Sequence, residues 1–341
     1  MNKRIFIYLI SAILLLGMGA SIAGYMLFLN RPLSVKEPIF LYIDDNDNAD
    51  SVIVKLERNA QGKRIRGFRM LVSLSKYEEN IHSGAYLLNA NNSTWDIFRR
   101  LQYGLQTPVK VTVPSVRTME QLIVSVSSQL MVEQKDLATL LNDSGYCAKI
   151  GYDRYTLPAL FIPNTYEVYW NISADNFIAR MQKEHQRFWN SERMAKARSI
   201  SLTPVEIATL ASIVDEETNQ ISEKPIVAGL YINRLKRGIP LQADPTVKFA
   251  LQDFGLKRIL YKHLETKSPY NTYLHAGLPP GPIRIASVSG MESVLNYAKH
   301  NYLYMCAKED FSGFHNFAST LSQHQANAYR YQRELNKRKI K

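Results

Sequence analysis

The chain opens on an apolar run, residues 5–29, that carries no charged side chain and directly follows Lys3 and Arg4. A helix of this length, at about 1.5 Å of rise per residue, crosses a hydrocarbon core about 30 Å thick. Because the run continues past the small residues around Ala20, we expect a retained membrane anchor, with a cleaved signal peptide as the alternative. The basic tail favours a cytoplasmic N-terminus, which places the chain after Arg31 on the far side of the membrane.

Short alternating elements follow a Pro-containing linker. Strand-like alternation and helical spacing predict a β-α-α-β order at residues 39–43, 49–59, 67–79 and 84–89. A further helix is expected to begin after Ser93 as its N-cap and to stop at Gly104, before a strand over 108–113. These elements indicate a compact small subdomain.

The remainder of the chain predicts a larger mixed region. Residues 117–160 have a mostly helical pattern, residues 302–308 are typical of a buried strand, and the basic C-terminus is typical of a solvated helix end. We therefore predict an α+β fold in three parts: a tail and anchor over 1–33, the small subdomain over 34–113, and the larger α+β domain over 114–341.

One predicted helix of the larger region ends on three consecutive acids. Thr203 and Glu206 form a capping-box start, and the helix is expected to run to about residue 218. Its apolar face includes Ile213 and Val214. Glu217 follows these two residues by four and three positions, so it continues the apolar face.

The two neighbouring acids, Asp215 and Glu216, are expected to rotate away toward solvent or the rim of a cleft. Glu217 is expected in a half-apolar surround, at the negative end of the helix dipole and beside two like charges, all of which raise the pKa of a carboxyl group. A carboxyl group that keeps its proton near neutral pH is what a general acid for glycosidic cleavage requires. The alternative is a surface acid paired with one of the many Lys or Arg side chains.

Two downstream segments supply polar groups. In "LQADPTV", Asp244 is expected to be the N-cap of a helix, and Gln242 offers a neutral amide of the kind that binds sugar hydroxyls. In "SPYNTYLHAGLPPGPI", an aromatic and polar cluster precedes a stiff Pro/Gly loop, and such groups suit carbohydrate rings. The binding candidates of this cluster are Tyr270, Asn271, Thr272 and Tyr273.

Neither His315 nor His324 has another candidate ligand at metal-binding spacing. The sequence also has no Gly-rich phosphate loop and no nucleophile elbow, so we expect neither a metal nor a cofactor. The two cysteines, Cys147 and Cys306, are expected to be free thiols.

The net charge of +12 admits nucleic acid, anionic lipid or an acidic polymer as a partner. The expected topology excludes nucleic acid, because the chain after the anchor lies outside the cytoplasm. We therefore expect the positive charge to face phospholipid headgroups or an anionic wall polymer.

Four motifs occur in order along the chain: "LASIVDEET", "INRLKRGIPLQADPTV", "YNTYLHAGLPPGPI" and "FHNFASTLSQH". Together they resemble the endolytic murein transglycosylases, the YceG-like family, and the resemblance covers the whole chain in layout. It implies a single-pass protein of the bacterial cytoplasmic membrane, with a LysM-like subdomain and a catalytic domain on the periplasmic or extracytoplasmic side. It also implies cleavage of nascent peptidoglycan strands between N-acetylmuramic acid and N-acetylglucosamine, ending strand elongation near peptidoglycan synthases or divisome proteins.

In the family motif, the catalytic glutamate belongs to an A-S-I-acid-x-E-T pattern that falls on Glu217. Three positions depart from the family pattern: Asn164 stands in place of an acid, Ser115 lies where a Glu-Gly pair is usual, and Asp215 replaces a Glu. None of them touches Glu217. The candidate substrate-binding residues are Gln242, Asp244, Tyr270, Asn271, Thr272, Tyr273 and His315.

The resemblance implies a mechanism with a single carboxyl group. Glu217 protonates the glycosidic oxygen and then, as a base, takes the proton of the muramic C6 hydroxyl, which closes a 1,6-anhydro ring. One alternative is a muramidase that hydrolyses the same bond with Asp244 as the partner carboxylate. Another is a membrane-anchored, glycan-binding scaffold without catalysis.

Overall fold

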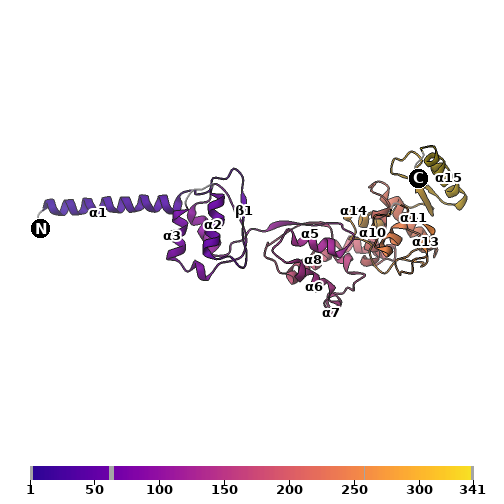
Figure 1. The fold of residues 1–341 in the computed structure, drawn as a ribbon, viewed down its shortest axis with the longest axis horizontal. Helices are drawn as coiled ribbons and strands as arrows, with labels where there is room; N and C mark the ends of the chain where they lie inside the picture. Colours follow the sequence, from indigo (N-terminus) through magenta and orange to yellow (C-terminus); the bar gives the residue numbers. More distant parts are fainter. Residues whose placement is uncertain (1–2, 61–64, 257, 339–341) are drawn as a thin grey trace. The chain divides into compact units, whose positions relative to one another are not determined.

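The computed structural model describes residues 3–60, 65–256 and 258–338. The chain forms two compact units, whose elements Figure 1 labels. The first unit comprises Met1–Val111 together with Gln129–Met131 and Glu167–Ile172, and the second comprises the remainder from Thr112 onward. The sequence did not indicate that two short later segments join the first unit, because such long-range contacts leave no local pattern.

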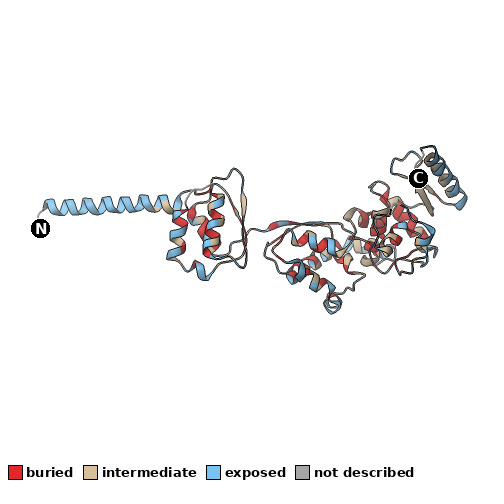
Figure 2. Cartoon of the chain, viewed as in Figure 1, coloured by how far each residue is buried: buried red, intermediate tan, exposed pale blue. Residues whose placement is uncertain are grey.

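The apolar run forms α1 (Lys3–Gly24), which continues as a π-helical turn, η1 (Tyr25–Leu29). Over Arg4–Leu29 the mean hydropathy is 2.3, so this helix is long and apolar enough to cross a membrane. Figure 2 shows α1 exposed along nearly all of its length.

The predicted β-α-α-β order is confirmed, and the expected helix and strand follow it: β1 (Ile39–Ile43), α2 (Ala49–Asn59), α3 (Arg66–Leu74), η2 (Tyr77–Glu79), β2 (Gly84–Leu88), α4 (Thr94–Gln102) and β3 (Val109–Val113). β1 and β2 pair antiparallel, with Ile39 opposite Leu88. The helix expected over 67–79 ends earlier, at Leu74, because Ser75 takes an extended conformation. The chain then resumes as the 3-10 turn η2.

Aromatic side chains fill the core of the first unit. Tyr77 is fully buried, and its ring lies 6.2 Å from that of Phe68 and 6.1 Å from that of Phe98. Gly67 brings the end of the apolar helix against this unit, since a Cβ at this position would lie 1.8 Å from the carbonyl oxygen of Leu27. The small unit therefore has a core of its own.

The chain from residue 117 to 160 is mostly helical, as predicted, with α5 (Met119–Ser127), α6 (Gln134–Asn142), α7 (Ser144–Lys149) and η3 (Leu157–Leu160). The strand β4 (Asn164–Val168) and the helices α8 (Ala174–Phe188) and α9 (Ser191–Ser199) follow. The next helices along the chain are α10 (Pro204–Glu217), α11 (Lys224–Lys236), α12 (Asp244–Leu251), α13 (Tyr261–Leu264) and α14 (Val288–Leu295).

The helix α10 forms the centre of the second core. It packs against α9, α11, α12 and α14, and all of its residues from Ile207 to Asp215 are buried. Figure 2 shows the same burial around α10 and α11. A helix that is apolar nearly all round has no solvent face. Burial of α10 therefore restricts the directions open to the acids of its last turn.

The described C-terminal part is an antiparallel hairpin followed by a helix. β5 (Tyr304–Ala307) pairs with β6 (His315–Ala318), with Tyr304 opposite Ala318. The helix α15 (Leu321–Lys337) packs against both strands and has no buried residue. The mixed α+β class is therefore confirmed, and the basic end of the chain is a solvated helix, as expected.

Candidate active site

The helix α10 starts where predicted, and its last residue, Glu217, lines a cavity. Thr203 caps the helix in the expected capping box: its hydroxyl accepts a hydrogen bond from the N–H of Glu206, and the Glu206 carboxylate accepts one from the N–H of Thr203. Glu217 is the last helical residue, since Thr218 is already extended, with φ −145° and ψ 137°. The end of a buried helix thus fixes the position of the Glu217 side chain.

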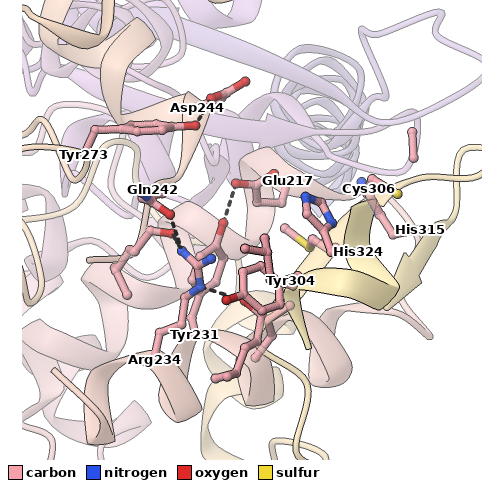
Figure 3. Close-up of a pocket in the computed structure, with 16 residues that line it drawn as sticks. Glu217, Tyr231, Arg234, Gln242, Asp244, Tyr273, Tyr304, Cys306, His315 and His324 are labelled. Atoms are coloured by element: carbon pink, nitrogen blue, oxygen red, sulfur yellow. Dashed lines mark hydrogen bonds between the residues drawn. The ribbon is translucent and has the colours of Figure 1, made fainter. Parts of the chain in front are cut away.

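The cavity has a volume of about 380 Å³. It collects side chains from α10, α11, the segment that leads into α12, and the C-terminal hairpin, as Figure 3 shows. The polar and aromatic residues that line it are Glu217, Tyr231, Arg234, Gln242, Asp244, Tyr273, Tyr304, Cys306, His315 and His324.

Glu217 is held by a neighbouring phenol. The hydroxyl of Tyr231 donates a hydrogen bond of 2.6 Å to Oε1 of Glu217. Burial raises the pKa of Glu217 to about 7, against the opposing effect of the Tyr231 hydrogen bond. The negative charge of Asp244 raises this pKa further, whereas the positive charges of His315 and Lys248 lower it. Glu217 therefore exchanges its proton near neutral pH.

The sequence-based account of Asp215 is wrong. This residue does not turn toward solvent: it is buried, and its Oδ1 accepts a hydrogen bond of 2.5 Å from Nζ of Lys224. Its Oδ2 accepts a hydrogen bond of 2.7 Å from the backbone N–H of Ser287, at the start of α14. Other helices surround α10, so Asp215 in its last turn forms an ion pair with Lys224 and does not face water.

Glu216 is partly exposed and lines a small second cleft, as predicted, and cations hold it there. Two hydrogen bonds of 2.9 Å join its carboxylate to the guanidinium of Arg117, and a third of 2.9 Å comes from Arg284. The like charges expected beside Glu217 are thus neutralised by cations, and burial is the main cause of its raised pKa.

Asp244 lines the cavity and does not cap α12. The residue before the helix is Ala243, and it makes no side-chain cap. Oδ1 of Asp244 instead accepts a hydrogen bond of 2.6 Å from the hydroxyl of Tyr273. The helix starts near Pro245, as predicted. The predicted capping role of Asp244 is wrong, because its carboxylate accepts the hydrogen bond from Tyr273 instead.

Of the predicted sugar-binding cluster, only Tyr273 reaches the cavity. Tyr270, Asn271 and Thr272 are buried. The amide of Asn271 donates to two backbone carbonyls, and the hydroxyl of Thr272 accepts a hydrogen bond of 3.0 Å from the N–H of Ala243. Thr272 therefore supports the segment that carries Gln242 and Asp244, since its carbonyl also accepts a hydrogen bond from the N–H of Gln242.

His315 lines the cavity and is oriented from behind by a buried acid. Oε2 of Glu223, whose side chain is 3% exposed, lies 2.8 Å from Nδ1 of His315. Oε1 accepts a hydrogen bond of 2.7 Å from the backbone N–H of the same histidine. The Glu223 carboxylate can only accept, so Nδ1 carries a proton and donates it in this hydrogen bond, which leaves Nε2 for the cavity.

Two further predictions concern the cysteines. Cys147 and Cys306 are both free, as expected; the first is buried and the second lines the cavity. Burial raises the pKa of the Cys306 thiol, so this group stays protonated at neutral pH. His324 lies nearby, with its ring stacked at 5.3 Å on that of Tyr304.

Sequence reasoning missed three residues of the site: Tyr231, Glu223 and Arg234. Tyr231 and Arg234 are three positions apart on α11, so a shared helical face was the available signal. Tyr231 was instead counted with the apolar face of that helix. Glu223 carried no signal, since its role depends on a strand that follows some ninety residues later.

Comparisons with known proteins agree with one another. The sequence model of the YceG-like family matches residues 41–330. The endolytic murein transglycosylase of Bacillus subtilis (strain 168) is 26% identical, in a match that covers 90% of this chain and 88% of that protein. The endolytic murein transglycosylase of Streptococcus pneumoniae serotype 2 is also 26% identical, and there the match covers 83% of this chain and 57% of that protein. A crystal structure of a YceG-like protein from Listeria monocytogenes is similar, with a TM-score of 0.56, 26% identity, and coverage of 86% of this chain and 99% of that one.

Proposed function

This chain belongs to the YceG-like family, and we propose that it is an endolytic lytic transglycosylase that cuts peptidoglycan strands with Glu217 as its single general acid and base. The bond cleaved joins N-acetylmuramic acid to N-acetylglucosamine, and the product carries a 1,6-anhydro-N-acetylmuramic acid end. The observation that carries this proposal is a carboxyl group with a pKa of about 7 on the wall of a 380 Å³ cavity.

The first chemical step uses protonated Glu217. Its proton passes to the glycosidic oxygen as the bond to C1 of the muramic residue breaks, and the electron pair of that bond leaves with the oxygen. Positive charge develops on the muramic ring. Glu217 becomes a carboxylate, which the 2.6 Å hydrogen bond from Tyr231 stabilises.

The second step closes the ring. The C6 hydroxyl of the same muramic residue attacks C1, and its proton returns to Glu217, so the enzyme regains its starting state. Because the nucleophile belongs to the substrate, a high effective molarity takes the place of a bound water. One carboxyl group therefore serves where hydrolases commonly use two.

The other cavity residues act as substrate contacts in this proposal. His315 presents Nε2 because Glu223 fixes its other nitrogen. Tyr273 offers an aromatic face, and Gln242 has an amide nitrogen beside the oxygen that Arg234 holds. These groups suit a sugar ring, which has apolar faces and polar edges.

The placement of the protein in the cell is part of the same proposal. The helix Arg4–Leu29 anchors the chain in the cytoplasmic membrane. The small LysM-like subdomain over 34–113 and the catalytic domain over 114–341 lie on its extracytoplasmic side. This position allows the enzyme to end nascent strands beside peptidoglycan synthases or divisome proteins.

A second candidate function is hydrolysis of the same bond. It is favoured by Asp244, which lines the same cavity and whose charge reaches Glu217. A muramidase with this pair leaves reducing ends, which are heavier than anhydro ends by one water.

The test is product analysis of the detergent-solubilised full chain on un-crosslinked glycan strands. We expect mass spectrometry to show anhydro ends from the wild type and none from Glu217→Gln. Glu192→Gln, at a carboxyl group that is 72% exposed on α9, is the matched control and should cleave like the wild type. Only reducing ends from the wild type would establish the hydrolase instead, and unchanged cleavage by Glu217→Gln would remove this residue from the mechanism.

A further inference from the structure

The cavity contains a buried cation with no carboxylate partner. Arg234, on α11, is 7% exposed. Its hydrogen-bond acceptors are all neutral: Nε donates to the carbonyl of Leu303 at 2.7 Å, and Nη1 to the carbonyls of Pro240 and Leu241 at 2.9 and 2.8 Å. Nη1 also lies 3.1 Å from Oε1 of Gln242. Within the described parts of the chain, no acid forms an ion pair with this guanidinium.

One nitrogen of the guanidinium is left over. Arginine has five N–H donors, and Nη2 of Arg234 makes no hydrogen bond to any residue that the structure describes. Nη2 is also not among the buried polar atoms that lack a partner, so it is open to the cavity that Arg234 lines. Figure 3 shows this group beside Tyr231, between Gln242 and Tyr304.

The charge of Arg234 acts on the cavity. Burial is the main cause that lowers the pKa of His324, and the positive charge of Arg234 lowers it further. The ring of Tyr304, whose centre lies 5.4 Å from the guanidinium carbon, compensates the charge of Arg234 only in part. A buried charge is costly unless an opposite charge pairs with it. The site is therefore prepared for an anion that arrives with the ligand.

We propose that Arg234 binds a carboxylate of the substrate on the floor of the cavity. This inference rests on the proposed function and names the part of the strand that the site recognises. A muramic residue carries a lactyl carboxylate in a strand without peptides, whereas in a peptide-bearing strand that group is an amide and the carboxylates lie on the stem. Both sources offer the same planar acceptor to Nη2.

The test measures binding, so that it does not depend on cleavage. The full-length Glu217→Gln protein, in detergent, is titrated with naked strands and with peptide-bearing strands, each with free carboxylates or with carboxylates converted to methylamides. We expect methylamidation to weaken binding about tenfold or more for the strand type that carries the recognised carboxylate. Loss in the naked strands alone identifies the lactyl group, and loss in the peptide-bearing strands identifies the stem. Equal dissociation constants within both pairs would overturn the inference.

Surface charge needs a control, because a chain of net charge +12 attracts any polyanion. The titrations are repeated at about 0.5 M salt, where exposed charges are largely screened. In the double variant with Arg234→Gln, the preference for free carboxylates should vanish; if that variant remains folded and keeps the preference, the recognition lies elsewhere. If it does not fold, the comparison at high salt decides alone. Cleavage by the wild type is scored separately, so failure of the proposed function is distinguished from failure of this inference.

Discussion

The hydroxyl of Tyr231 donates a 2.6 Å hydrogen bond to Oε1 of Glu217, and this contact opposes the burial that raises the pKa of the carboxyl group. Burial and the Glu217 charge also raise the pKa of Tyr231, so the phenol remains a donor throughout the neutral range. The two effects on Glu217 leave its pKa at about 7. A group at this value both gives and takes a proton at neutral pH, which is what one residue acting as acid and then base requires.

Replacing Tyr231 with Phe should raise the pKa of Glu217, since the lost hydrogen bond favours the carboxylate. The alkaline limb of kcat against pH then moves to higher pH. We also expect kcat at its optimum to fall about tenfold, because the carboxylate formed on bond cleavage loses a charge-assisted hydrogen bond. The measurement is the rate of anhydro-end formation across pH. If the alkaline limb does not move, the loss of activity at high pH is not caused by ionisation of Glu217.

Glu217→Gln should stabilise the protein in alkaline solution. The pKa of Glu217 is raised from an ordinary value of 4.5 to about 7, so ionisation is penalised in the folded state, and stability falls as pH rises between these values. Below pH 4.5 the two proteins should be equally stable, whereas above pH 7 the variant should gain up to about 3 kcal/mol. Urea denaturation of both proteins at the two pH values checks this difference. A variant that is less stable than the wild type at pH 8 contradicts it.

Asp215→Ala should be strongly destabilising. The substitution leaves Lys224 buried without its partner, and it frees the N–H of Ser287 at the start of α14. Removing one member of a buried ion pair costs about 3–5 kcal/mol. In a double-mutant cycle with Lys224→Met, the double variant should lose less stability than the sum of the two single variants. Strict additivity would mean that the two residues do not interact.

Asp244→Asn should change the pH profile and leave the chemistry of the product unaltered. The charge of Asp244 raises the pKa of Glu217, so its removal lowers that pKa and moves the alkaline limb to lower pH. The Asn side chain can still accept the hydrogen bond from Tyr273. Anhydro ends should still be formed, as shown by mass spectrometry. Complete loss of cleavage would favour the hydrolase with Asp244 as partner carboxylate.

The sequence was informative where the pattern is local. The capping-box start at Thr203 was predicted from four consecutive residues and is confirmed, and Glu217 is half-buried at the end of the same helix. The fate of Asp215 was not visible, because only the packing of α10 among four helices removes its solvent side. Likewise, Arg234 shows its role only when distant carbonyls and the C-terminal hairpin gather around it.

Of the three positions expected to depart from the family pattern, Ser115 and Asp215 make tertiary contacts. Ser115 donates a hydrogen bond of 2.6 Å to the carbonyl of Ile285, far from Glu217 in sequence and outside the residues that line the cavity. Asn164 is exposed at the start of β4. Asp215, one methylene shorter than Glu, fits between Lys224 and α14, where a Cβ on Gly290 would lie 2.6 Å from its Oδ1.

The most direct test of the central claim is a titration of the Glu217 carboxyl group. In full-length protein labelled with ¹³C at the glutamate carboxyl carbons, the signal that is absent from Glu217→Gln belongs to this residue. We predict that its chemical shift titrates with a midpoint of about 7. A midpoint near the ordinary value of 4.5 would show that Glu217 is ionised at neutral pH, and would contradict its role as the proton donor.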